Sequence, residues 1–332
     1  MASVPALVPA EHTSDHVLVV PRPDDAAWGA LPELAGAWFD DADWLRAPTV
    51  AAAPRASGGA RFHGVRAASG PVAGVLRLGD EHRATGPFPL DPAAAAALGC
   101  PHPAEAWALG REDGALDQRG ARPAAYDDRD GIARAFAAAL PVGEELHVVR
   151  WGVAVARRSG GLLLADGRQV LRPDPAASVD LTVWPARAVP AAELLEVVRA
   201  VVATSALEAA PGGAPGHRVR ARTPYDGDLV VTQEPTGGLL RSVAREPWPD
   251  GAPATVHRLA WLPHEPYELQ VETPSGVHVI ARARARALLA RVAALLQGRA
   301  GGVVADDAGF VVGARELGLR REAQTPGARA WV

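Results

Sequence analysis

The sequence GGLLLADGRQVLRP at residues 160–173 decides how the chain is interpreted, because a similar stretch, GGVVADDAGFVVGA, recurs at residues 301–314. Each stretch follows a segment rich in Ala, Val and Leu with a helical pattern. Each begins with two glycines, continues as an apolar strand, turns at Asp and Gly, and ends in a second strand. Glycines that follow a helix end it and open a turn, whereas a phosphate-binding loop precedes its helix. The two stretches therefore predict a chain built twice from one plan, and they are not phosphate loops.

A second pair of similar segments supports this interpretation. The strand predicted at His16–Pro21 (HVLVVP) aligns without gaps with Asp180–Pro185 (DLTVWP), at an offset of 164 residues from residue 16 to residue 180. The glycine stretches align at an offset of 141 residues, from residue 160 to residue 301, so the first half must contain extra chain. We expect it near residues 110–127 and in a helix at 130–140. The alternative is that helix, glycine, strand, turn and strand occur twice in this order by chance.

The length and composition are those of a globular protein with two domains. The chain has 332 residues, of which 48% are hydrophobic and 22% are charged, enough for two cores of ordinary size. The order of predicted strands and helices indicates an α+β fold with two tandem, duplicated domains, each a mostly antiparallel sheet with helices packed on one face. The predicted boundaries are a loose leader at 1–15, a first α+β domain at 16–173, a linker at 174–178, a second α+β domain at 179–318 and a frayed tail at 319–332.

Local patterns predict the other elements. Helices are expected where apolar residues recur at helical spacing between capping signals, at Ala26–Phe39, Asp91–Leu98, Asp130–Leu140, Glu145–Arg158, Ala191–Val202 and Arg284–Leu296. Strands are expected at Arg61–Ala68, Val72–Leu78, Arg218–Thr223, Asp228–Glu234, Leu239–Ala244, Val256–Trp261, Tyr267–Thr273 and Val277–Ala283.

Missing residue types and motifs exclude several classes of enzyme. All 34 basic residues are Arg, and the sequence has no Lys. P-loop NTPases, protein kinases and Schiff-base or PLP enzymes are therefore excluded, because each needs a lysine amine. No Gly-x-Ser-x-Gly is present, and no Gly-x-Gly-x-x-Gly follows a strand, so the hydrolase elbow and the dinucleotide fingerprint are absent. The heavy use of Ala, Gly, Pro and Arg is typical of a GC-rich bacterial genome.

The sequence offers no recognisable metal or thiol site. Cys100 is the sole cysteine, which excludes an intrachain disulfide and a thiolate zinc cluster. The acidic groups at residues 40–43 and 127–130 lack the pattern of a calcium loop and are interpreted as helix caps. We therefore assign no catalytic, cofactor-binding or metal-binding residue and no cofactor. An acid–base site dispersed along the chain stays open, because general acids and bases need no local motif.

Tryptophan and arginine provide the candidates for an interaction surface. Three tryptophans lie close together near the N-terminus, where core packing is the ordinary alternative. Three arginines alternate with alanine near the C-terminus, and in an extended segment all three would share one face. That face could contact carboxylate or phosphate groups, or it could protect an edge strand from aggregation. The candidate residues are Trp28, Trp38, Trp44, Arg282, Arg284 and Arg286.

These observations predict a non-catalytic protein-binding scaffold, adaptor or regulatory, whose partner is another protein of unknown identity. The first alternative is an enzyme with a dispersed acid/base site between the two halves. The second is a weak nucleic-acid binder that uses the C-terminal arginines, although a net charge of −4 argues against it. No secretory signal or membrane-spanning run is visible, so we expect a cytoplasmic protein without a membrane partner.

Overall fold

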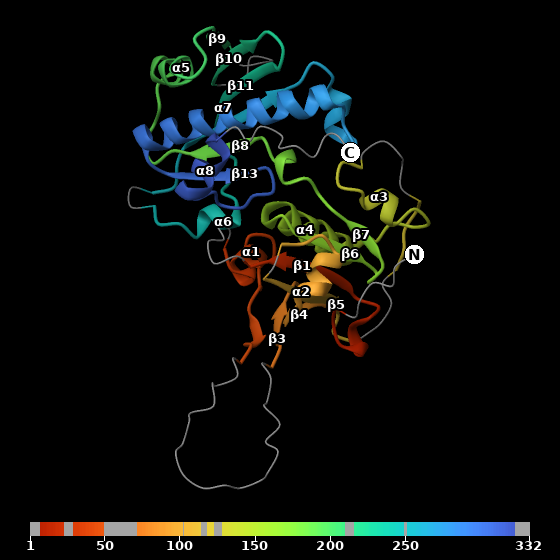
Figure 1. Ribbon diagram of the computed structural model, residues 1–332. Helices are drawn as coiled ribbons and strands as arrows, with labels where there is room; N and C mark the ends of the chain where they lie inside the picture. Colours follow the sequence, from red (N-terminus) through yellow and green to blue (C-terminus); the bar gives the residue numbers. More distant parts are fainter. Residues whose placement is uncertain are drawn as a thin grey trace, which may run out of the picture.

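The computed structural model describes residues 7–22, 29–49, 72–101, 103–113, 118–122, 128–209, 216–248 and 251–322. These residues form two antiparallel sheets with helices, one sheet in each half of the chain (Figure 1). The predicted α+β class with two tandem sheet-bearing halves is therefore confirmed.

The described part of the first half contains a seven-stranded sheet in the order β2-β3-β4-β5-β1-β6-β7. In chain order, with η for a 3-10 helix, its elements are η1 (Ala10–His12), β1 (His16–Pro21), α1 (Leu31–Gly36), β2 (Trp44–Arg46), β3 (Gly74–Arg77), β4 (His82–Pro89), α2 (Pro92–Ala97), β5 (Ala104–Arg111), α3 (Ile132–Ala135), α4 (Gly143–Ser159), β6 (Leu162–Ala165) and β7 (Gln169–Leu171).

The described part of the second half contains a six-stranded sheet in the order β13-β8-β12-β11-β10-β9. Its elements are η2 (Pro175–Ala177), β8 (Leu181–Trp184), α5 (Ala191–Arg199), β9 (Ala206–Ala209), β10 (His217–Thr223), β11 (Gly227–Pro235), α6 (Arg241–Ala244), β12 (Thr255–Leu262), η4 (Pro266–Gln270), α7 (Gly276–Ala300), β13 (Val303–Asp306) and α8 (Ala314–Arg321). Helix α8 thus extends two residues past 319, where the tail was predicted to start.

The two sheets repeat one topology. Strand β1 lies between β5 and β6, and β8 lies between β12 and β13. In each half these neighbours are the fourth strand after the first one and the strand that follows the long helix, α4 or α7. An isolated bridge between Ala305 and Val311 stands where β7 stands in the first sheet. The first half has a longer connection than the second in two places. Residues 112–142, between β5 and α4, correspond to the shorter segment 263–275, and this is where we expected extra chain. Residues 37–73, between α1 and β3, correspond to the shorter segment 200–216.

The layers of the two halves also correspond. Two helices pack on one face of each sheet: α1 and α4 on the first sheet, and α5 and α7 on the second. A short helix covers part of the opposite face, α2 in the first half and α6 in the second. Strand β1 is buried along its whole length because both of its faces are covered, which explains its continuous apolar sequence.

The paired glycines have a definite structural role in both halves. Gly160 and Gly301 end α4 and α7 with φ of +71° and +67°, values that suit glycine. The second glycine of each pair crosses the first strand of its sheet at close range. A Cβ on Gly161 would lie 2.1 Å from the carbonyl oxygen of Val19, and one on Gly302 would lie 2.0 Å from that of Trp184. The repeated Gly-Gly therefore ends a helix and lets the chain pass that strand.

Several predicted elements are wrong. The segment Val277–Ala283 is the first part of helix α7, where Ser275 accepts a hydrogen bond from the backbone N–H of His278 at 3.2 Å. Alternating Ala and Arg resembles a strand pattern, but both are strong helix formers, and the Ser275 cap starts a helix. Two other predicted strands contain helices instead: Leu239–Ala244 (α6) and Tyr267–Thr273 (η4). Two predicted helices are shorter than expected: Ala26–Phe39 (α1) and Asp130–Leu140 (α3). The predicted strand Arg61–Ala68 lies outside the described residues.

Candidate functional site

The turn after β13 joins the second half to the first. Asp306, the last residue of β13, and Asp307, in the turn, meet two consecutive arginines at the end of α4: Arg158 Nη1 lies 2.9 Å from Asp306, and Arg157 Nη1 lies 3.4 Å from Asp307. Phe310, three residues further on, is buried in the core of the first half. The junction is therefore a built contact, with charge pairs beside an apolar anchor.

The charged groups at this junction are buried. The side chains of Arg158 and Asp306 are 6% and 3% exposed, and Arg320 lies 3.4 Å from the same carboxylate. Burial raises the pKa of Asp306 above its usual value, and the charges of the two arginines act against this rise. Ser178, which follows η2, donates a hydrogen bond to Asp307 at 2.6 Å, so the segment between the halves is tied to the same turn.

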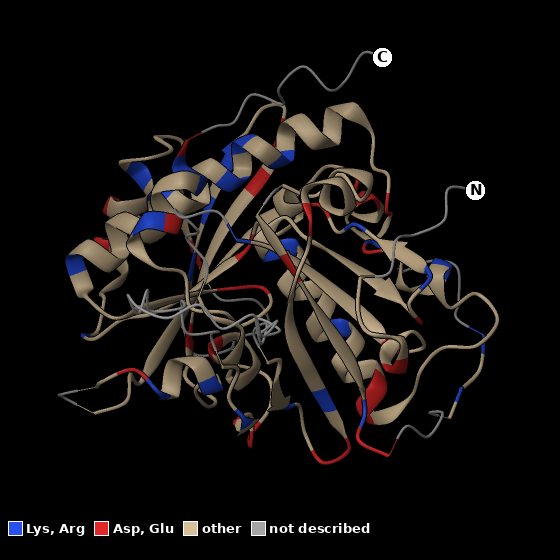
Figure 2. Cartoon of the chain, turned by 60° about the horizontal axis from the view of Figure 1, so that its bottom comes forward, with Lys and Arg blue, Asp and Glu red and all other residues tan. Residues whose placement is uncertain are grey.

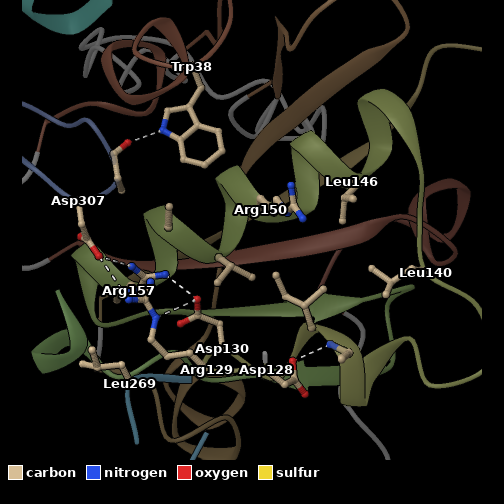
Figure 3. Close-up of a pocket in the computed structure, with 15 residues that line it drawn as sticks. Trp38, Asp128, Arg129, Asp130, Leu140, Leu146, Arg150, Arg157, Leu269 and Asp307 are labelled. Carbon is tan, nitrogen blue, oxygen red and sulfur yellow. Dashed lines mark hydrogen bonds and ion pairs between the residues drawn. The ribbon is translucent and has the colours of Figure 1, made fainter. Parts of the chain in front are cut away.

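A pocket of about 470 Å³ opens beside this turn (Figure 3). Its walls come from α3 and the residues around it, from one side of α4, and from the second half. One part of the lining is apolar and another part is charged. The apolar side chains are Ile132, Leu140, Leu146, Val153 and Leu269, and the charged ones are Asp128, Arg129, Asp130, Arg150, Arg157 and Asp307.

The three carboxylates of the pocket are already held by protein groups. Asp128 accepts hydrogen bonds from the backbone N–H groups of Ala133 at 2.6 Å and of the next residue, so it caps α3. Asp130 lies 2.6 Å from Arg157, which also pairs with Asp307. Figure 3 shows Arg157 between these two aspartates. The carboxylates therefore hold the pocket together.

Arg150 differs from the other charged residues that line the pocket. It lies on α4, its side chain is exposed, and it has no hydrogen bond or ion pair to any described residue. The pocket therefore presents a cation without a partner next to an apolar wall.

The predicted interaction residues near the N-terminus are not gathered on one surface. Trp38 lines the pocket, and its indole Nε1 donates to the carbonyl oxygen of Ala308 across the junction at 2.9 Å. Trp44, half-buried on β2, packs against Trp107 with ring centroids 6.1 Å apart. Trp28 lies outside the described residues. Of these tryptophans, the structure brings Trp38 to the pocket.

The predicted face of three arginines does not form, because the segment is helical. Positions four apart share a side of a helix, whereas a position two away lies on another side. Arg282 is buried and pairs with Asp174, and Arg286 donates to the carbonyl oxygen of Ser178 at 3.2 Å. Arg284 is exposed. Figure 2 shows basic and acidic residues along the chain; the three arginines on α7 do not form the single face on which the nucleic-acid hypothesis depended.

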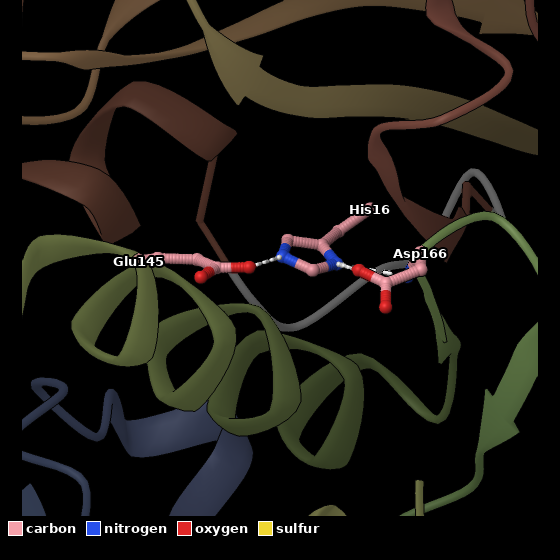
Figure 4. A group of neighbouring side chains, drawn as sticks. All are labelled: His16, Glu145 and Asp166. Carbon is pink, nitrogen blue, oxygen red and sulfur yellow. Dashed lines mark hydrogen bonds and ion pairs between the residues drawn. The ribbon is translucent and has the colours of Figure 1, made fainter. Parts of the chain in front are cut away.

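A second polar cluster lies inside the first half. The backbone N–H of Asp166 donates to Nδ1 of His16 at 2.9 Å, so this ring carries its proton on Nε2 and donates it to Glu145 at 3.1 Å. Arg119 pairs with both carboxylates. The three groups are close enough to hold a metal ion, yet both ring nitrogens are engaged on opposite sides of the imidazole (Figure 4). We interpret the cluster as an ion-pair network in which His16 and Glu145 are buried and Arg119 and Asp166 lie at the surface.

The second half has a related pair at matching positions. Asp180 aligns with His16, and Asp307 aligns with Asp166, at the offsets of the two repeats. The pKa of Asp180 is raised to about 6, mainly by burial; the charge of Asp307 contributes to this rise, whereas the hydrogen bond from the backbone N–H of Trp261 and the charge of Arg129 act against it. The alignment of the two repeats could have indicated that Asp180 and Asp307 lie close together. The pair was not predicted from the sequence because no motif surrounds either residue.

No protein-family model, curated protein or solved structure matches the chain. Among the described residues, no helix combines the length and the apolar character needed to cross a bilayer.

Proposed function

We propose that the protein binds another protein without catalysis, as an adaptor or regulatory scaffold, and that the partner contacts the pocket at the junction. The observation that carries this proposal is the exposed Arg150 beside an apolar wall, which pairs with no acidic group in the described part of the chain. The pocket's carboxylates are committed to a helix cap and to ion pairs, so they are poorly placed to act as free bases. Recognition needs only surface and charge, which this pocket offers.

The lining favours a partner group that combines an apolar side chain with a carboxylate. A volume of about 470 Å³ falls within the range of about 300–1,000 Å³ found for ligand sites and would accept one or two side chains. The carboxylate would pair with the guanidinium of Arg150, which can bind it in bidentate fashion. Trp and Arg, here Trp38 and Arg150, are enriched among residues that dominate binding energy at interfaces.

The test is capture of a specific partner by the wild-type protein and two variants. Arg150→Glu reverses the charge at the pocket, and Arg291→Glu reverses an exposed helical arginine on α7 as a matched control. A partner retained by wild type and by Arg291→Glu but lost from Arg150→Glu would support the proposal. A partner that all three proteins retain equally would contradict it, as would the absence of any partner at near-stoichiometric yield.

The second candidate is an enzyme with an acid/base site between the halves. The observation that favours it is Asp180, whose pKa of about 6 suits proton transfer near neutral pH, beside Asp307 at the edge of the pocket. A panel of ester and phosphate-ester substrates would test it. Turnover that Asp180→Asn abolishes, with unchanged circular dichroism, would support an enzyme; turnover that survives this change would not.

A further inference from the structure

A row of three polar side chains crosses the second sheet at a distance from the pocket. His217 on β10 pairs in register with Gln233 on β11, and Gln233 pairs with His257 on β12. Residues of the same strands at alternate positions, such as Val219, Val231 and Leu259, belong to the core under α5 and α7. Since alternate residues of a strand share a face, the three polar side chains point to this covered face.

The two histidines have buried nitrogen atoms without partners. His257 is 0% exposed, and neither of its ring nitrogens has a hydrogen bond to the described residues. The buried Nε2 of His217 also has none. An unsatisfied buried polar group is costly, and such a group in a native protein calls for an explanation such as a bound ion or water.

Gln233 is oriented by the loop above it. Its amide Nε2 donates to the carbonyl oxygen of Val189 at 3.1 Å. The carbonyl oxygen of Val189 can only accept a hydrogen bond, so the amide nitrogen of Gln233, and not its amide oxygen, must face it. This bond fixes the orientation of the Gln233 side chain and leaves its amide oxygen Oε1 available. Val189 thus holds Gln233 in the way that outer groups hold metal ligands.

The spacing allows the two imidazoles to converge above Gln233. Neighbouring strands lie about 4.8 Å apart, so the backbones of His217 and His257 are separated by roughly 10 Å. Imidazoles that rise from both sides of one residue can reach a common atom.

We propose that His217, His257 and Gln233 bind one divalent transition-metal ion, with Zn²⁺ as the best candidate. Two imidazole nitrogens and an amide oxygen form a borderline donor set that suits Zn²⁺, Cu²⁺ or Ni²⁺ better than Mg²⁺ or Ca²⁺. An ion in this position would satisfy the orphaned nitrogens, and it would tie β10, β11 and β12 to the loop before α5. The site is independent of the function proposed for the pocket.

The test is calorimetric titration of the chelator-treated full chain with ZnCl₂, with Co²⁺ absorption as a spectroscopic readout. We expect one equivalent to bind to wild type, with affinity reduced at least tenfold in His217→Ala. This residue is only half-buried, so its replacement should leave the fold intact by circular dichroism. His264→Ala, at an exposed histidine, is the matched control and should bind like wild type. Gln233→Leu should alter the Co²⁺ spectrum.

Three outcomes would overturn the proposal. The first is no stoichiometric binding by wild type, in which case an enclosed water fills the site. The second is equal affinity of wild type and His217→Ala. The third is loss of binding in His16→Gln instead, which would place the ion in the cluster with Glu145 and Asp166.

Discussion

Replacing Arg158 with methionine should destabilise the protein strongly, because this change removes one partner from a buried charge cluster. Methionine keeps most of the apolar stem of the side chain and removes the guanidinium. Asp306 would keep Arg320 at 3.4 Å but lose its contact at 2.9 Å, and the carbonyl oxygen of Val311 would lose a donor at 2.6 Å. Breaking a buried pair in this way costs about 3–5 kcal/mol. Because one arginine remains, we expect about 3 kcal/mol, at the lower end of that range.

The assay is urea unfolding followed by circular dichroism, with Arg299→Met as the control. Arg299 is an exposed arginine that lies 3.5 Å from Glu196, and its loss should change the free energy of unfolding by less than about 1 kcal/mol. Asp306→Asn removes the charge and keeps an oxygen for the backbone N–H of Phe310. Its combination with Arg158→Met should be less destabilising than the sum of the two, by about 1–3 kcal/mol. Additive effects, or an Arg158→Met variant as stable as the control, would refute a coupled junction.

Three further substitutions should change the free energy of unfolding: one in a pH-dependent way, and the other two in opposite directions. Because the pKa of Asp180 is raised from 3.8 to about 6, the folded state holds this proton more tightly than the unfolded state. Its stabilising contribution is therefore complete below pH 3.8 and lost as the pH rises to about 6. The stability of Asp180→Asn relative to wild type should thus increase between pH 4 and pH 7, by up to about 3 kcal/mol; a difference that is constant with pH in urea unfolding would contradict the assigned environment. Gly302→Ala should destabilise by more than about 1 kcal/mol because its Cβ would collide with the carbonyl oxygen of Trp184. Gly298→Ala in α7, where a Cβ meets nothing within 4 Å, should stabilise by about 0.5–1 kcal/mol; equal effects of both alanines on the urea midpoint would refute the close crossing.

The repeated plan of the chain could be predicted because its signals are local. A helix that ends in two glycines needs a left-handed residue and a close backbone crossing, and both requirements are written in consecutive letters of the sequence. The first strand of each half is a short apolar run bounded by proline, which is also a local pattern. Strand order is a non-local property, so the sequence alone predicted two sheets but not their identical order.

The misassigned elements show where local patterns compete. Alternation of Arg and Ala at residues 281–287 matches the period of a strand, but the helix propensity of both residues and the cap at Ser275 decide the outcome. The pattern therefore placed Arg282, Arg284 and Arg286 on one face, whereas the helix turns Arg282 and Arg286 inward. The Ser275 cap was the signal in the sequence that could have decided between the two periods.

The candidate site could not be predicted, because its residues come from distant parts of the chain. Trp38, Arg150 and Asp307 meet only when the turn after β13 docks on α4. Sequence reasoning placed a dispersed site between the halves as one alternative, and a pocket with three carboxylates lies there. It could not show that these carboxylates are engaged or that Arg150 has no partner among the described residues, since both depend on packing between the halves.

We propose that the pocket at the junction binds a group that is apolar and carries a carboxylate, and that the carboxylate pairs with Arg150. NMR spectra of the ¹⁵N-labelled tryptophan side chains test this directly, because the indole N–H of Trp38 bonds across the junction at the pocket. N-acetyl-leucine is a suitable probe, and for a ligand of this size we expect a dissociation constant of about 1 mM. Binding at Arg150 should give a saturable shift of the Trp38 resonance that is weaker with N-acetyl-leucinamide and absent in Arg150→Glu. A Trp38 resonance that does not move, or that moves equally with the amide and in Arg150→Glu, would contradict it.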